Sequence, residues 1–284
     1  MFEIIEANIS INQLKERFKS VIREIEKNNE NLLDMLVLCC FVHRCRTPVN
    51  MDMLLAFFKQ KIENYKDIYN MNNTLGSMLT DYFGELADSE QDHFVPRSTI
   101  VAESILKQVR PKVLKRVVLN FTKNVSRYRI SRFDIFRRKA YDANLMTFVF
   151  QEWEEGRDFY ELVHSFDNNN PYLRQQGALY LAYNRKFKEA FRWIDEAIVM
   201  SKGAITSIRN SHAIILFKAN IDSPDGDSTV QTTLEKSMDI LKECYTYDKR
   251  KTYHALTFAE QSLLYLEKYP NQEGAIEYLK TANI

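Results

Sequence analysis

The chain has 284 residues, of which 45% are apolar, so it is long enough for two domains with packed cores. Lys and Arg number 39 against 38 acidic residues, and this balance excludes a strong overall field toward nucleic acid or an anionic membrane. Only 7 Gly and 6 Pro are present, which is sparse for a turn-rich β fold. The composition therefore predicts a mainly α protein.

We expect neither a signal peptide nor a membrane-spanning segment in this sequence. The longest apolar run, Leu32 to Val42, is interrupted by Asp34 and is too short to cross a bilayer. The first residues include Glu3 and Glu6, where a signal peptide would be basic. Four cysteines without disulfide-like spacing are typical of a reducing compartment, so we expect a cytoplasmic protein that does not contact a membrane.

Residues 1–30 are predicted to be an arm of one strand and one helix. Apolar and polar residues alternate loosely over 2–9, and Phe18, Ile22 and Ile25 then recur at helical spacing. A single strand followed by a single helix cannot form a core of its own.

Residues 31–108 show three apolar helical patterns, over 32–41, 53–58 and 75–83, and the third pattern ends at Gly84. The polar turn inside 85–97 then predicts a β-hairpin. Three helices and a hairpin in this order are typical of a winged-helix domain, a variant of the helix-turn-helix. Ser98 and Pro111 predict the starts of two connecting helices.

Cys39, Cys40, His43 and Cys45 lie close together in the sequence, as the ligands of a metal ion often do. Cys45 falls on another helix face, however, and no second pair of ligands lies nearby, whereas a structural zinc site needs four converging ligands. Core packing of the cysteines is therefore the favoured interpretation, and neither a metal nor a cofactor is predicted.

Residues 109–141 are predicted to be a basic helical connector, since twelve Lys and Arg lie between 107 and 139 with Asp134 as the only acid. Candidate contacts to phosphate or nucleic acid are Arg127, Arg129, Arg132, Arg137 and Arg138. Tyr128 and Phe133 lie among them and could stack on bases. The alternative, which the near-neutral total charge favours, is that the basic side chains lie along apolar surface between the domains.

Residues 142–284 carry the pattern of helix pairs. Ser131 and Asp134 have capping-box spacing, which predicts a long helix that ends near Gly156. Pro171 then predicts a helix start, Asn184 a turn and Phe187 the start of the partner helix.

A small-large-small triplet recurs after 47 and then 38 residues and predicts close packing of successive helices. The three triplets are Ala190, Ile194, Ala197; Ser237, Leu241, Cys244; and Ala275, Leu279, Ala282. Both periods exceed the 34 residues of a tetratricopeptide repeat, and the loop Asp222 to Ser228 accounts for part of the excess. The pattern predicts a tetratricopeptide-like α-helical repeat array that binds a protein or peptide.

No catalytic motif accompanies these elements. All seven glycines are isolated, and none precedes a Lys-Ser or Lys-Thr pair, as a nucleotide-binding loop requires. The histidines have no serine or cysteine nucleophile at a recognisable motif. We expect a non-enzymatic protein.

The segments Asn170 to Leu181, Phe187 to Ala190, Trp193 to Ile198 and Ile208 to Ile214 resemble the helical repeats of bacterial STAND-type signalling ATPases, including those of antiviral defence. Phe94 to Glu103 resembles the junction that follows the winged helix in that family. The resemblance implies a sensor and regulatory half that acts on an ATPase in cis or in trans, since this sequence lacks the ATPase itself. A nucleic-acid-binding winged-helix regulator with a peptide-sensing repeat domain is the alternative.

Overall fold

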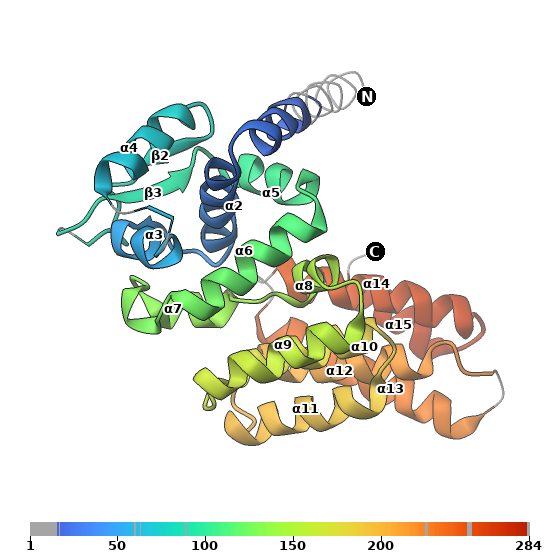
Figure 1. Ribbon diagram of the computed structural model, residues 1–284. Helices are drawn as coiled ribbons and strands as arrows, with labels where there is room; N and C mark the ends of the chain where they lie inside the picture. Colours follow the sequence, from blue (N-terminus) through green and yellow to red (C-terminus); the bar gives the residue numbers. More distant parts are fainter. Residues whose placement is uncertain are drawn as a thin grey trace. The chain divides into compact units, whose positions relative to one another are not determined.

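The structure is a computed structural model that describes residues 16, 18–59, 61–62, 64–88, 90–224, 227–248 and 252–282. The protein is mainly helical and divides into two compact units (Figure 1). Unit 1 comprises residues 1–140 and 148–150, and unit 2 comprises 141–147 and 151–284. The strand predicted for residues 2–9 lies outside the described residues.

The core of unit 1 is built around helix α2 (Glu30–Arg44), which contacts α5, α6 and β3. Asn29 caps it, because the Asn29 side chain accepts a hydrogen bond from the Leu32 amide at 3.0 Å. Every residue from Leu32 to Val42 is buried. An α-helix that is apolar on all sides is stable only when other elements surround it, and this explains the central position of α2.

A three-stranded antiparallel sheet completes unit 1, in the strand order β1-β3-β2. The chain passes from α2 to β1 (Val49–Asn50), α3 (Met51–Phe57), α4 (Tyr65–Thr74), β2 (Leu79–Asp81) and β3 (His93–Pro96). Val49 pairs with Phe94 on one side of β3, and Thr80 pairs with Val95 on the other. Strands β2 and β3 and helix α4 are drawn in teal in Figure 1.

The predicted helix over 75–83 is wrong. Helix α4 ends at Thr74, and the residues that follow it turn into strand β2, with Leu79 opposite Pro96. Leu75, Met78 and Leu79 are all buried. The spacing of these apolar residues therefore predicted their burial correctly, but it predicted the wrong backbone conformation. A hairpin is present, but only its second strand, β3, lies within the predicted range 85–97, because its first strand, β2, ends at Asp81.

The two connecting helices begin where the sequence predicts. Helix α5 (Thr99–Gln108) starts after Ser98, whose hydroxyl accepts from the Val101 amide at 3.2 Å. Helix α6 (Pro111–Asn124) has Pro111 in its first turn. One face of α6 is buried, and its residues are Val113, Leu114, Val117, Val118 and Phe121.

The long helix predicted from Ser131 to Gly156 is wrong, because three helices occupy this stretch. They are α7 (Phe133–Lys139), α8 (Ala143–Val149) and α9 (Trp153–Phe166), and a short 3-10 helix, η1 (Arg127–Arg129), precedes them. Arg132 and Tyr141 adopt left-handed backbone conformations, with φ of 54° and 58°, and each interrupts the helical path. The Ser131 hydroxyl forms no cap; it accepts a hydrogen bond from Asn50 Nδ2 at 2.8 Å.

Unit 2 consists of stacked helix pairs and is helical-repeat-like (Figure 1). The pairs are α10 (Pro171–Tyr183) with α11 (Phe187–Met200), α12 (Thr206–Asn220) with α13 (Ser228–Tyr247), and α14 (Thr252–Lys268) with α15 (Glu273–Ala282). The predicted starts at Pro171 and Phe187 are confirmed. The first helices of successive pairs also contact each other, α10 with α12 and α12 with α14, so the pairs share one continuous core.

Gly177 sets the close approach within the first pair. A Cβ atom at this position would collide with the ring of Trp193, which is 1% exposed and packs from α11 against α10. Arg174 stacks on the same ring, with its guanidinium carbon 4.7 Å from the ring centroid. In the part of the chain that the structure describes, no helix is both long and apolar enough to span a membrane.

Candidate interaction surfaces

The small-large-small triplets lie at helix contacts in the first two pairs of unit 2. Ala190, Ile194 and Ala197 are fully buried on α11. On α13, the Ser237 hydroxyl donates to the Ala213 carbonyl of α12 at 2.7 Å, and both Leu241 and Cys244 are buried. In the third triplet, on α15, Ala275 is buried while Leu279 and Ala282 are only half-buried. Packing is therefore looser in the last pair.

Buried polar side chains join α10 to α12. The Gln175 amide donates to the Ser207 carbonyl at 2.9 Å and to the Ser211 hydroxyl at 2.7 Å. Asn210 is fully buried one residue away, and neither polar atom of its amide has a hydrogen-bond partner in the structure. Satisfied buried polar groups fix the register of packed helices, whereas an unsatisfied one lowers stability.

Helix α14 has an exposed apolar face. Tyr253, Leu256, Leu263 and Leu264 are 47%, 55%, 43% and 45% exposed, and their spacing places them within about 100° of the helix circumference. The opposite side of the same helix carries buried residues such as His254, Phe258, Ser262 and Tyr265. Four large apolar side chains on one exposed face are typical of a protein-interaction site.

Two carboxylates lie on the same face of α14. Glu260 lies between Leu256 and Leu263 in the sequence, Glu267 follows Leu264, and both are exposed. We call Tyr253, Leu256, Glu260, Leu263, Leu264 and Glu267 the α14 face. Its apolar centre and negative charge fit a partner segment that carries apolar and basic residues.

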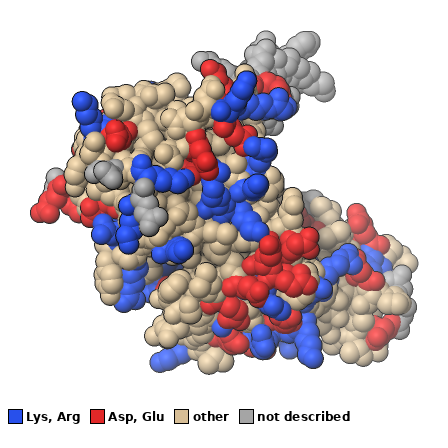
Figure 2. Space-filling view, in the orientation of Figure 1, with Lys and Arg blue, Asp and Glu red and all other residues tan. Residues whose placement is uncertain are grey.

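Acidic side chains also gather over α9 (Figure 2). Glu152, Glu154 and Glu155 are exposed around the start of the helix, and Asp158 pairs with Arg157 at 2.8 Å. These carboxylates complement the positive end of the helix dipole, so they form a solvated face that needs no ligand.

The candidate arginines near η1 are engaged within unit 1. Arg127 stacks on Tyr128 with 4.9 Å between its guanidinium carbon and the ring centroid, and its Nη2 also donates to the phenol oxygen at 2.8 Å. Arg129 lies 3.9 Å from Asp52, and its carbonyl accepts from Asn50 Nδ2 at 3.0 Å. Tyr128 is 83% exposed, which leaves one aromatic ring open to solvent in this segment.

The remaining candidate arginines lie on or beside α7. Arg132 is 3.7 Å from Asp134, and Arg137 lies over the Phe133 ring at 5.8 Å. Arg138 is exposed on α7. Four of the five candidate arginines, Arg127, Arg129, Arg132 and Arg137, thus have a contact with a side chain of unit 1.

The loop that joins β2 to β3 is acidic. Glu85, Asp88, Glu90 and Asp92 are exposed along it, as is Asp81 at the end of β2, and Figure 2 shows acidic side chains at this hairpin tip. Phe83 lies among them and is 88% exposed. This concentration of negative charge would repel a phosphate backbone.

The histidine and cysteine candidates are parts of the packing. Cys39 and Cys40 are fully buried on α2, and burial raises the pKa of both thiols. His93 is buried, and its ring contacts the Gln91 carbonyl at 2.9 Å and the Ser131 hydroxyl at 3.3 Å. Over the described ranges, no three His, Cys, Asp or Glu side chains are grouped closely enough to hold a metal ion.

Comparison of the chain with protein-family models, curated proteins and solved structures yields no match.

Proposed function

We propose that the chain is a non-enzymatic interaction and sensor module in which unit 2 holds a protein or peptide. The observation that carries this proposal is the α14 face, an exposed apolar surface on a helix that is otherwise anchored in a stacked array. A tetratricopeptide-like array gains its binding surface in this way, because the first helices of its pairs lie side by side. The occupant we propose is an amphipathic segment with apolar and basic residues.

Peptide display tests this proposal. A random-peptide library is selected on the full chain and counter-selected on the variant Leu256→Asp/Leu263→Asp. We expect the recovered peptides to combine apolar residues with Lys or Arg, and to lose at least about tenfold in affinity for the variant. Recovery of no peptide, or of peptides that bind both proteins equally, contradicts the proposal.

The finer proposal is that unit 1 is a winged-helix domain and that the whole chain is the regulatory part of a STAND-like signalling or defence ATPase. The order helix, strand, helix, helix, strand, strand and the sheet order β1-β3-β2 support a winged helix. If the reading frame immediately upstream encodes a Walker-type ATPase, its hydrolysis rate should change when this chain is added. An ATPase rate that the chain leaves unchanged contradicts this role.

The second candidate function is nucleic-acid binding, favoured by the exposed Tyr128 beside the stacked Arg127. The acidic β2–β3 loop and helix α4, whose charged residues are Lys66 and Asp67, argue against it. Filter binding of duplex DNA at two salt concentrations decides the question. Affinity that falls with salt, and that falls again in Arg127→Gln/Arg129→Gln/Arg132→Gln, would establish this alternative.

A further inference from the structure

A cavity of about 700 Å³ lies in unit 1 between the helical residues 18–28 and the end of α5. Its wall contains five basic and two acidic side chains, whereas the whole protein carries a formal charge of only +1. Cavities of this volume hold small organic ligands in other proteins. We propose that this cavity, the 19–110 pocket, binds a small phosphate-bearing anion.

The charge balance selects an anion as the ligand. Both acidic side chains already have a cation, since Glu16 lies 3.3 Å from Lys19 and Glu26 lies 2.5 Å from Arg110. Arg23 is exposed and has no ionic partner among the described residues. Arg23 thus brings an unpaired positive charge to a concave space, where the electric field is focused, and Lys27 and Lys107 add positive charge to the surrounding surface.

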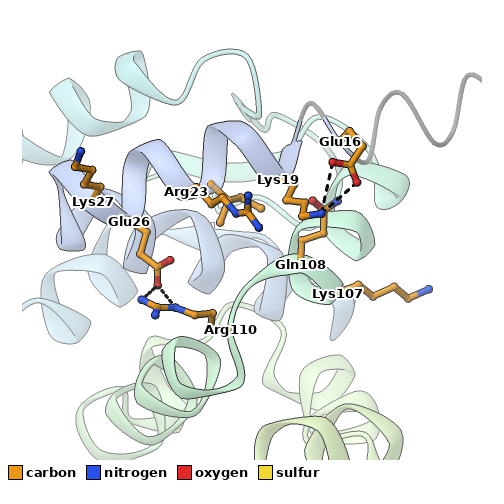
Figure 3. Close-up of a pocket in the computed structure, with 9 residues that line it drawn as sticks. Glu16, Lys19, Arg23, Glu26, Lys27, Lys107, Gln108 and Arg110 are labelled. Carbon is orange, nitrogen blue, oxygen red and sulfur yellow. Dashed lines mark hydrogen bonds and ion pairs between the residues drawn. The ribbon is translucent and has the colours of Figure 1, made fainter.

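The orientation of the side chains separates those that would bind from those that only add charge. Figure 3 shows Arg23 directed into the space between the two segments, and the Glu26 carboxylate directed to Arg110. Lys27 and Lys107 project away from the pocket in the same view. Arg23 and Arg110 are therefore the two guanidinium groups placed to bind, and a guanidinium fork matches the oxygens of a phosphate.

Gln108 supplies the polar part of the wall. Its side-chain nitrogen and oxygen are both buried, and neither has a hydrogen-bond partner in the described structure. An unpaired buried amide costs free energy, and a phosphate oxygen that reached the Gln108 nitrogen after a side-chain rotation would remove that cost. Ile22 and the methylene stems of the basic residues leave no aromatic surface for a ring, so the phosphate group itself is the recognised element.

The 19–110 pocket has an extension, a second hollow of about 220 Å³ that shares the lining residues Glu26 and Arg110 with it. Lys112 and Arg116 line this extension together with Glu30. Arg116 is paired with Glu30 and Asp34, so the unpaired positive charge of this hollow among the described residues is Lys112. Lys112 lies in the first turn of α6, whose amide groups carry the positive end of that helix dipole.

Calorimetric titration of the full chain with inorganic pyrophosphate at constant ionic strength tests the proposal. We expect saturable one-to-one binding, and Arg23→Gln should weaken it by about tenfold. The matched control is Arg46→Gln, because Arg46 is exposed beyond the far end of α2 and should leave the affinity within about twofold. No saturable heat, or equal weakening by both variants, overturns the proposal.

A second variant is expected to bind pyrophosphate more tightly, and misfolding cannot produce such an increase in affinity. Glu26→Gln removes the carboxylate that occupies Arg110, so it should tighten pyrophosphate binding severalfold. Unchanged or weaker binding in this variant overturns the assignment of Arg110. Malonate, titrated under the same conditions, should bind at least about fivefold more weakly than pyrophosphate, since a phosphate offers more acceptor oxygens. Equal affinities would mean that the pocket senses charge alone and would overturn the phosphate assignment.

Discussion

The carboxylate of Asp34 accepts a hydrogen bond from Arg116 Nη2 at 2.5 Å, although the Asp34 side chain is only 3% exposed. All other buried residues of α2 are apolar, so this pair places one charge inside the core of unit 1. Lys61 lies 3.9 Å from the same carboxylate and adds a second, weaker interaction. Burial raises the pKa of Asp34, while the hydrogen bond and the charge of Arg116 oppose the rise.

This balance predicts that substitutions of the two partners have unequal effects on the free energy of unfolding. Arg116→Gln leaves a buried carboxylate with Lys61 alone, and we expect it to lower the free energy of unfolding by about 2 kcal/mol at neutral pH. Asp34→Asn removes the buried charge and leaves Arg116, which reaches solvent and Glu30, so we expect a change of less than about 1 kcal/mol. Urea unfolding of both variants gives the comparison, and an equal loss in both would contradict it.

The raised pKa of Asp34 also predicts a pH dependence. In the window above the ordinary value of 3.8, the folded state binds more protons than the unfolded state. The contribution of Asp34 to the free energy of unfolding therefore falls as the pH rises through that window. Relative to the wild type, Asp34→Asn should thus be more stable at neutral pH than at pH 4, and a difference that does not depend on pH would contradict the shift.

Gly177 and Gly274 provide a matched pair of glycine-to-alanine substitutions in unit 2. At Gly177 the added methyl group meets the buried Trp193 ring, and we expect a loss of about 2 kcal/mol. At Gly274, on α15, no neighbouring atom lies within 4 Å, and the better helix propensity of alanine should raise stability by about 0.5 kcal/mol. Thermal unfolding measures both, and a stabilised Gly177→Ala would show that α10 and α11 pack less closely than described.

Asn210 and Gln175 provide a second matched pair, in which the side-chain amide is unsatisfied at Asn210 and hydrogen-bonded at Gln175. Asn210→Leu removes an unsatisfied amide and should stabilise the protein by about 1 kcal/mol. Gln175→Leu removes an amide with two hydrogen bonds, leaves the Ser207 carbonyl without that donor, and should cost about 2 kcal/mol. Chemical denaturation distinguishes the two cases. Destabilisation by Asn210→Leu would indicate that the Asn210 amide has a partner in solution, such as a buried water.

The α14 face should contribute to binding and little to folding. Leu256→Asp/Leu263→Asp changes side chains that are about half exposed, so the free energy of unfolding should stay within about 1 kcal/mol of the wild type. Phe258→Ala on the same helix empties a fully buried position and should cost about 3 kcal/mol. If the double variant is as unstable as Phe258→Ala, the α14 face is part of the core.

Local signals in the sequence located many of the helices. Ser98, Pro111 and Pro171 each act on the turn that follows them, through a side-chain cap or a restricted φ angle, so their effect can be read without tertiary structure. The strands were harder to predict, because β2 is defined by its pairing with β3 more than ten residues later. The helical path is interrupted at Arg132 and at Tyr141, and neither residue is a glycine or proline, so the sequence gives no local signal for the interruption.

The candidate surfaces depend on contacts between distant residues. Leu256 and Phe258 are both apolar, so periodicity alone could not tell which side of α14 is exposed. Arg110 and Glu26 line one pocket although 84 residues separate them. The excess of Lys and Arg in the basic segment could be read from the sequence. The pairing of Arg129 with Asp52 could not, because the fold brings these two residues together.

Lys268, near the end of α14, donates to the carbonyl oxygens of Ile221 and Ser223 in the loop that follows α12. The extra residues of the second pair are thereby held by a side chain of the third. If the chain opens from its C-terminal end, detachment of α14 removes these two hydrogen bonds and leaves the loop with the exposed ion pair between Asp222 and Arg185. Amide hydrogens around Ser223 should then exchange together with those of the last pair, ahead of the helices α12 and α13 on either side of the loop.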